Sequence, residues 1–183
     1  MTAATPAHPL PSQTLVFAIG NESRGDDALG PLLLRGLQDW LNDTPLAPQV
    51  ELLEDFQLQI EHALDLQGRQ RVLFVDAGMD TEAPFAFYRI ESSAEPVLYS
   101  HALAPTAVLQ AYRQFYREEP PASYVLCIRG QSFELGEPLS PEAQSHLAAA
   151  LDFARKLLND TANWPEHCDT ARLASPQTAS PGA

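Results

Sequence analysis

Two adjacent acidic residues, Asp26 and Asp27, lie in the segment LVFAIGNESRGDDALG, which spans residues 15–30. Residues 15–19 suit a strand buried on both faces, and residues 31–41 carry leucines at helical spacing. The acidic pair therefore lies between a strand and a helix, at the edge of a sheet where α/β proteins collect ligands. Carboxylates here can bind a metal ion, or they can cap the helix and complement its dipole.

A second carboxylate and a histidine extend this set. Asp76 ends the apolar run RVLFVD of residues 71–76, which predicts another strand, and His101 precedes a helix expected from Pro105 to about residue 116. In a parallel sheet, Asp27 and Asp76 can project from the same edge. Two carboxylates and one imidazole suit a divalent metal such as zinc, nickel or cobalt, and three protein ligands leave coordination positions open. The alternatives are a carboxylate that hydrogen-bonds a turn and a loop histidine without a ligand role.

The elements that must position these residues alternate between strands and helices. We expect further strands at residues 50–53, 85–90 and 123–128, a helix at 57–66, and a final helix capped by Ser140 that runs to residue 158. This alternation predicts an α/β fold. We expect a three-layer domain with a mostly parallel, mixed central sheet, helices on both faces and an antiparallel edge strand at residues 85–90.

Composition sets the domain limits. The chain has 183 residues, of which 45% are hydrophobic, and this suits one globular domain. We place that domain at residues 14–158, between a flexible N-terminal segment at 1–13 and a flexible tail at 159–183 that is rich in Pro, Ser, Thr and Ala. His62 and His146 fall in helical patterns and are interpreted as surface or half-buried helix residues rather than as ligands.

Charge and hydropathy exclude several classes of partner. A net charge of −13 argues against nucleic acid or an anionic membrane surface as the main partner. No apolar stretch approaches the roughly 20 residues that span a bilayer, and the first residues lack the features of a signal peptide. We therefore expect a cytoplasmic protein. Cys127 and Cys168 form neither a disulfide framework nor a CxxC metal pair.

Four segments, in order, resemble motifs of the hydrogenase maturation proteases, the endopeptidases that finish the large subunit of nickel-iron hydrogenases. They are GNESRGDDALG, FVDAGMD, YSHALAPTAVL and IRGQSFELGEPLSPEA. The resemblance extends over residues 14–158, and four motifs in one order are far more specific than any single one.

The resemblance implies a function for the acidic set. Family members remove a C-terminal extension from the large-subunit precursor after nickel insertion and are thought to recognise that nickel directly. The family pattern places the metal contacts on Asp27, Asp76 and His101. Because the nickel is already in the precursor, it would arrive with the substrate. Asp26 is then either a general base or a residue that orients the first ligand.

Two departures from the family pattern bear on specificity. Many relatives have Glu where this chain has Asp27, which is one methylene shorter. Many also have an acidic residue, two glycines and a threonine where this chain has residues 54–57, EDFQ. The latter segment resembles proteases that serve soluble, cofactor-reducing hydrogenases. Two other functions stay open, namely a nickel-sensing or nickel-carrying module that cuts nothing, and a hydrolase of similar architecture that acts on a small metal-bound substrate.

Overall fold

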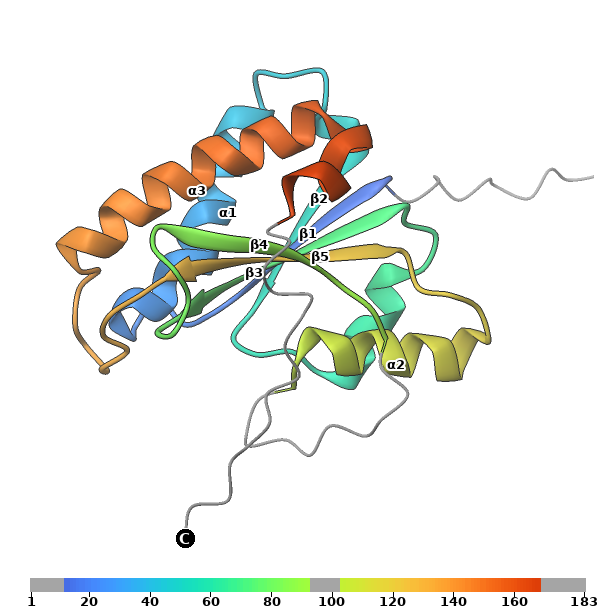
Figure 1. The fold of residues 1–183 in the computed structure, drawn as a ribbon, viewed down its shortest axis with the longest axis horizontal. Helices are drawn as coiled ribbons and strands as arrows, with labels where there is room; N and C mark the ends of the chain where they lie inside the picture. Colours follow the sequence, from blue (N-terminus) through green and yellow to red (C-terminus); the bar gives the residue numbers. More distant parts are fainter. Residues whose placement is uncertain (1–11, 93–102, 169–183) are drawn as a thin grey trace, which may run out of the picture.

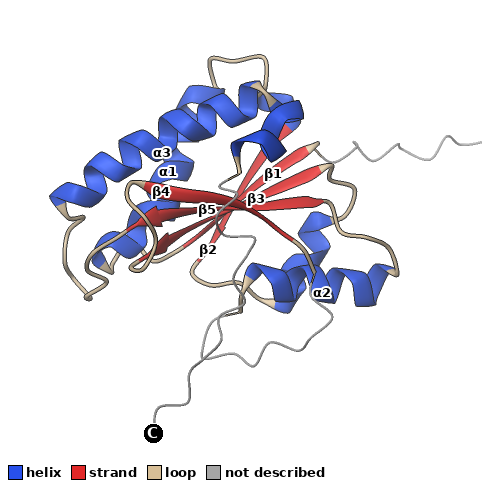
Figure 2. Cartoon of the chain, in the orientation of Figure 1, coloured by secondary structure: helices blue, strands red, loops and turns tan. Residues whose placement is uncertain are grey.

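The computed structural model describes residues 12–92 and 103–168. Within these residues, five strands form one twisted sheet in the order β2-β1-β3-β5-β4 (Figures 1 and 2). All neighbouring strands are parallel except β4, which pairs antiparallel with β5 at one edge. The strands are β1 (Thr14–Ile19), β2 (Val50–Asp55), β3 (Arg71–Gly78), β4 (Phe85–Ile90) and β5 (Ala122–Arg129).

Helices cover both faces of this sheet, which gives the predicted three layers. On one face lie α1 (Leu29–Leu41) and α3 (Pro141–Asn159), and on the other lie α2 (Pro105–Tyr116) and the 3-10 helix η3 (Ile60–Leu66) (Figure 1). Alternate residues of β1 pack against the two helical layers, since successive side chains along a strand point to opposite faces of the sheet. Val16 packs with α1 and α3, and Phe17 packs with α2 and η3.

The expected strands and the helices α1, α2 and α3 are confirmed, with boundaries that shift by one or two residues. The helix predicted at residues 57–66 is wrong in its start and its type. It begins at Ile60 and is a 3-10 helix, because Gln59 is extended (φ −130°, ψ 159°) and forms a reciprocal capping box with His62. None of the helices in residues 12–92 and 103–168 has the length and apolar character needed to cross a membrane.

The limits predicted for the two flexible ends need correction. Residues 161–167 form the 3-10 helix η4, and its Trp164 is only 1% exposed against the core. The indole Nε1–H of Trp164 donates to the Leu157 carbonyl at 2.6 Å. Composition alone missed this, because one buried aromatic side chain can anchor a polar segment. At the other end, the Gln13 carbonyl accepts the Arg71 N–H at 3.2 Å, and residues 1–11 and 169–183 lie outside the described residues.

Candidate active site

Asp27 lies just beyond the carboxyl end of β1, in the 3-10 turn Gly25–Ala28 that leads into α1. Its Oδ2 accepts the Asn21 N–H at 2.9 Å. Burial raises the pKa of Asp27 above its ordinary value, while the Asn21 bond and the nearby Arg24 charge lower it in part. The carboxylate is therefore held in place by the loop that follows β1.

Two glycines allow this loop and helix to sit so close to the sheet. Gly20 has a φ of +147°, and a Cβ there would lie 2.0 Å from the Asp27 carbonyl oxygen. A Cβ on Gly30 would lie 2.4 Å from the carbonyl oxygen of Ile19. Any larger residue at either position would push Asp27 away from the end of β1.

Asp76 lies on the neighbouring strand β3, where the charge of Asp27 acts on it. Burial raises its pKa to about 7, the hydrogen bond from the Ala77 N–H opposes the rise, and the negative charge of Asp27 adds to it. The Ala77 N–H lies 2.8 Å from Asp76 Oδ1. Asp27 and Asp76 thus lie at the same carboxyl edge of neighbouring strands, as the sequence predicted. Two carboxylates of this kind attract a cation, which relieves their repulsion.

The face toward which Asp76 points follows from the strand pattern. Asp76 comes two residues after Phe74, whose side chain packs in the layer of α2 and η3, so both side chains point to that face. Helix α2 runs antiparallel to β5, so the amino end of α2 lies at the same edge as the carboxyl ends of the parallel strands (Figure 1). The predicted ligand His101 precedes α2 in sequence but lies outside the described residues, and its place in a metal site stays a prediction.

Asp26 has a different environment from its neighbour. It is fully buried, and its two oxygens accept four hydrogen bonds from the loop between β5 and α3. The donors are Gln131 N–H (2.7 Å), Ser132 N–H (3.3 Å), Ser140 N–H (2.7 Å) and Ser140 Oγ–H (2.8 Å). Burial alone would raise the pKa of Asp26, but these bonds outweigh it and hold the pKa below the ordinary value.

This network fastens two loops that are far apart in the sequence. The Asp26 N–H donates to the Ser132 carbonyl at 2.8 Å, and Ser140 Oγ also accepts the Ala143 N–H at 3.2 Å as the cap of α3. Asp26 therefore connects the turn that carries Asp27 to the start of α3. With both oxygens engaged and shielded from solvent, it has the surroundings of a positioning residue rather than of a general base.

A groove lies at the carboxyl end of β2, next to the loop that holds Asp27. It has a volume of about 420 Å³, and its lining includes Asn21, whose N–H holds Asp27. Three acidic side chains and one aromatic ring contribute to its walls: Glu22, Glu54, Asp55 and Phe56. The Phe56 side chain is 72% exposed. A segment of another chain that entered this groove would contact Asn21, the residue whose N–H holds Asp27.

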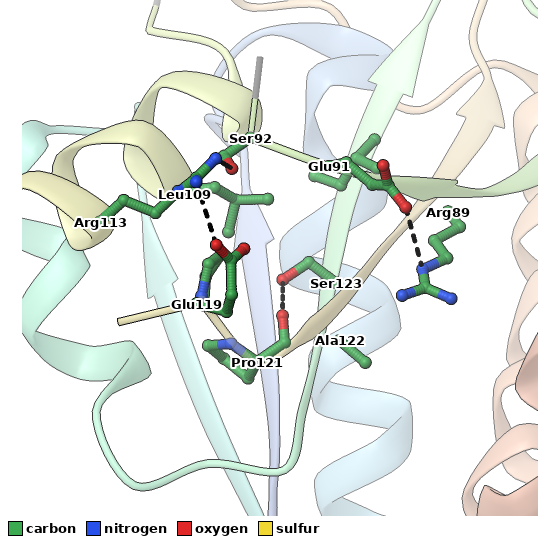
Figure 3. Close-up of a pocket in the computed structure, with 11 residues that line it drawn as sticks. Arg89, Glu91, Ser92, Leu109, Arg113, Glu119, Pro121, Ala122 and Ser123 are labelled. Carbon is green, nitrogen blue, oxygen red and sulfur yellow. Dashed lines mark hydrogen bonds and ion pairs between the residues drawn. The ribbon is translucent and has the colours of Figure 1, made fainter. Parts of the chain in front are cut away.

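A second hollow lies at the opposite edge of the sheet, where β4 ends and β5 begins (Figure 3). It has a volume of about 350 Å³, and its charged groups pair with one another. Arg113 lies 3.0 Å from Glu119, and Arg89 lies 4.0 Å from Glu91. Because this hollow is remote from Asp27 and Asp76, we place the candidate active site at the carboxyl edge. Among the described residues, no group of three His, Cys, Asp or Glu side chains is arranged to hold a metal ion.

Solved structures with the same fold come from hydrogenase maturation. The hydrogenase maturating endopeptidase HybD from E. coli aligns with a TM-score of 0.62 and 23% identity, over 82% of this chain and 94% of that one. The NiFe hydrogenase maturation protease HycI from Thermococcus kodakarensis aligns with a TM-score of 0.61 and 19% identity, over 81% and 94%. A hydrogenase 2 maturation peptidase from a Thaumarchaeota archaeon gives 0.56 and 19%, over 81% and 99%.

No protein-family model matches the chain, and no curated protein sequence matches it. The structural comparisons therefore establish the fold. This protein has the α/β fold of the hydrogenase maturation proteases, along nearly the whole length of the solved structures.

Proposed function

We propose that this protein is an endopeptidase that removes a C-terminal extension from the large-subunit precursor of a nickel-iron hydrogenase, after nickel has been inserted. The observation that carries the proposal is the position of Asp27 and Asp76 after and on the neighbouring parallel strands β1 and β3, at the carboxyl edge of a fold shared with such proteases. The four ordered sequence motifs support the same function independently.

In this proposal the nickel ion belongs to the substrate. Asp27 and Asp76 supply carboxylate oxygens to the ion in the precursor, and His101 supplies an imidazole nitrogen. Asp76, with a pKa of about 7 in the metal-free protein, releases its proton readily when a cation comes close. A site that is incomplete without precursor ligands binds free nickel weakly, so cleavage follows only after the ion has been inserted.

The chemistry is the addition of water across one peptide bond. A divalent ion polarises a carbonyl oxygen or lowers the pKa of a bound water, and either effect promotes attack on the scissile carbon. The protein's own contribution is positional. Asn21 orients Asp27, the four-bond network of Asp26 fixes the turn that bears it, and the groove beside Asp27 accepts an extended segment of the precursor.

A cleavage assay tests the proposal. Purified protein is incubated with a nickel-loaded large-subunit precursor, beside a nickel-free precursor and an Asp76→Ala variant, and intact mass is followed. We expect loss of a discrete C-terminal peptide only with nickel and the unmodified protein. A stable complex with unchanged mass would instead indicate a nickel-binding module, and no interaction with several such precursors would refute the proposed function.

A further inference from the structure

His62 connects three parts of the structure that the proposed chemistry leaves unexplained. Its Nδ1 accepts the Gln59 N–H at 2.9 Å, and its Nε2 lies 3.3 Å from Asp55 Oδ2. Its ring makes a T-shaped contact with the ring of the buried Phe17, with centroids 4.7 Å apart and planes at 60°. The His62 side chain is only 16% exposed. These contacts fix the imidazole from three sides.

The hydrogen bonds determine which nitrogen carries the proton. Because Nδ1 accepts an N–H, it bears no hydrogen, and the neutral ring carries its proton on Nε2. Nε2 faces Asp55 Oδ2 at 3.3 Å, within ion-pair distance. A ring protonated on both nitrogens would lose the bond from Gln59, which belongs to the capping box of η3.

Asp55 connects His62 to the groove. Its second oxygen, Oδ1, accepts the Phe56 N–H at 2.6 Å, and both Asp55 and Phe56 line the groove beside Asp27. The Gly20 N–H donates to the Asp55 carbonyl at 3.2 Å, so the backbone of Asp55 is already held by β1. His62 therefore restrains the parts that this backbone bond does not hold, namely the Asp55 side chain and the start of the following loop.

We propose that His62 is a positioning residue for precursor binding. The contact of its Nε2 with the Asp55 carboxylate holds that carboxylate, and through it the exposed Phe56, in the wall of the groove beside the loop that carries Asp27. The proposal rests on the proposed function. It assigns His62 no contact with nickel or with the scissile bond, so its removal should weaken precursor binding and leave the chemical step intact.

Three variants test the link. His62→Phe keeps a ring against Phe17 and loses both nitrogen contacts, whereas Asp55→Asn keeps an oxygen for the Phe56 N–H and presents an amide to His62. For cleavage of nickel-loaded precursor we expect each variant to raise KM about tenfold and to change kcat less than about twofold. The double variant should also raise KM only about tenfold, because both changes break one connection.

The matched control is His146→Phe. His146 is a part-buried helix histidine in α3 whose Nδ1 lies 2.9 Å from the Arg129 carbonyl oxygen, on the other side of the sheet from η3. We expect its KM to stay at the wild-type value. A KM increase of about a hundredfold in the double variant, or equal increases in His62→Phe and His146→Phe, would overturn the proposal.

A measurement without precursor separates this proposal from the proposed function. The exchange rate of the Phe56 amide hydrogen, followed by NMR in the free protein, should rise about tenfold in His62→Phe and stay unchanged in His146→Phe. An unchanged rate in His62→Phe would refute the anchoring of Phe56, whether or not the protein cuts the precursor. If the rate rises but the wild-type protein cuts no precursor, the proposed function fails, and with it the role of His62 in precursor binding.

Discussion

Replacing Asp76 with asparagine should stabilise the metal-free protein near neutral pH, although it removes a residue of the proposed active site. Burial and the charge of Asp27 raise the pKa of Asp76 to about 7, against an ordinary value of 3.8. Between these values the folded protein binds a proton that the unfolded chain releases, so the free energy of unfolding falls as pH rises. Asparagine resembles the protonated acid and can keep the bond from the Ala77 N–H.

The size of the effect follows from the two pKa values. The interval from 3.8 to about 7 corresponds to roughly 4 kcal/mol, at 1.36 kcal/mol for each pKa unit. Asp76 retains some contact with solvent, which screens its charge and reduces this figure. We therefore expect Asp76→Asn to be more stable than wild type by about 1–3 kcal/mol near pH 7.5, with no gain near pH 4.

Urea unfolding in the presence of a chelator, at several pH values from 4 to 7.5, measures this difference. The control is Asp80→Asn, which removes an exposed carboxylate four residues further along and should change stability by only a few tenths of a kcal/mol. An Asp76→Asn variant that is no more stable than wild type at pH 7.5, or whose advantage does not grow with pH, would show that burial does not raise the pKa of Asp76.

Three further changes test the structural basis of the site. Asp26→Ala should lower the free energy of unfolding by about 3–5 kcal/mol, because it removes a fully buried carboxylate that accepts four hydrogen bonds, while cleavage per folded molecule survives. Lost cleavage with an unchanged melting temperature would instead indicate catalysis. Gly20→Ala should lower the free energy of unfolding by about 3 kcal/mol or more, measured with denaturant, because the new Cβ would overlap the Asp27 carbonyl. A variant as stable as wild type would contradict that contact. Trp164→Ala should cost about 3–5 kcal/mol in the same assay, and a cost below about 1 kcal/mol would show that η4 is not part of the core.

The positions of Asp27 and Asp76 could be predicted because they depend on local pattern and one general rule. Apolar runs locate β1 and β3, and parallel strands place the residues that follow them at a common edge. The same pattern located β4 as an antiparallel edge strand. The pattern did not show which strand lies next to β4, since pairing with β5 rather than with β3 depends on contacts between distant segments.

The surroundings of Asp26 could not be read from the sequence. Its hydrogen-bond donors lie 105 to 114 residues further along the chain, and no local pattern connects them. A helix cap, a general base and a residue that orients the first ligand were all open for Asp26. The structure joins its carboxylate to the cap of α3, which gives it the surroundings of a positioning residue. The contact between His62 and Asp55 was missed for a similar reason. The helical pattern around a histidine does not show which distant residue its side chain contacts, here the end of strand β2.

The most direct test of the account is the affinity of this protein for nickel-loaded and nickel-free precursor, measured for wild type and for Asp76→Asn. If Asp27 and Asp76 recognise the nickel in the precursor, wild type should prefer the loaded form by at least about tenfold, roughly 1.4 kcal/mol. Asp76→Asn should lose that preference while binding the nickel-free form as wild type does. A preference for the loaded form that persists unchanged in Asp76→Asn would contradict the central claim.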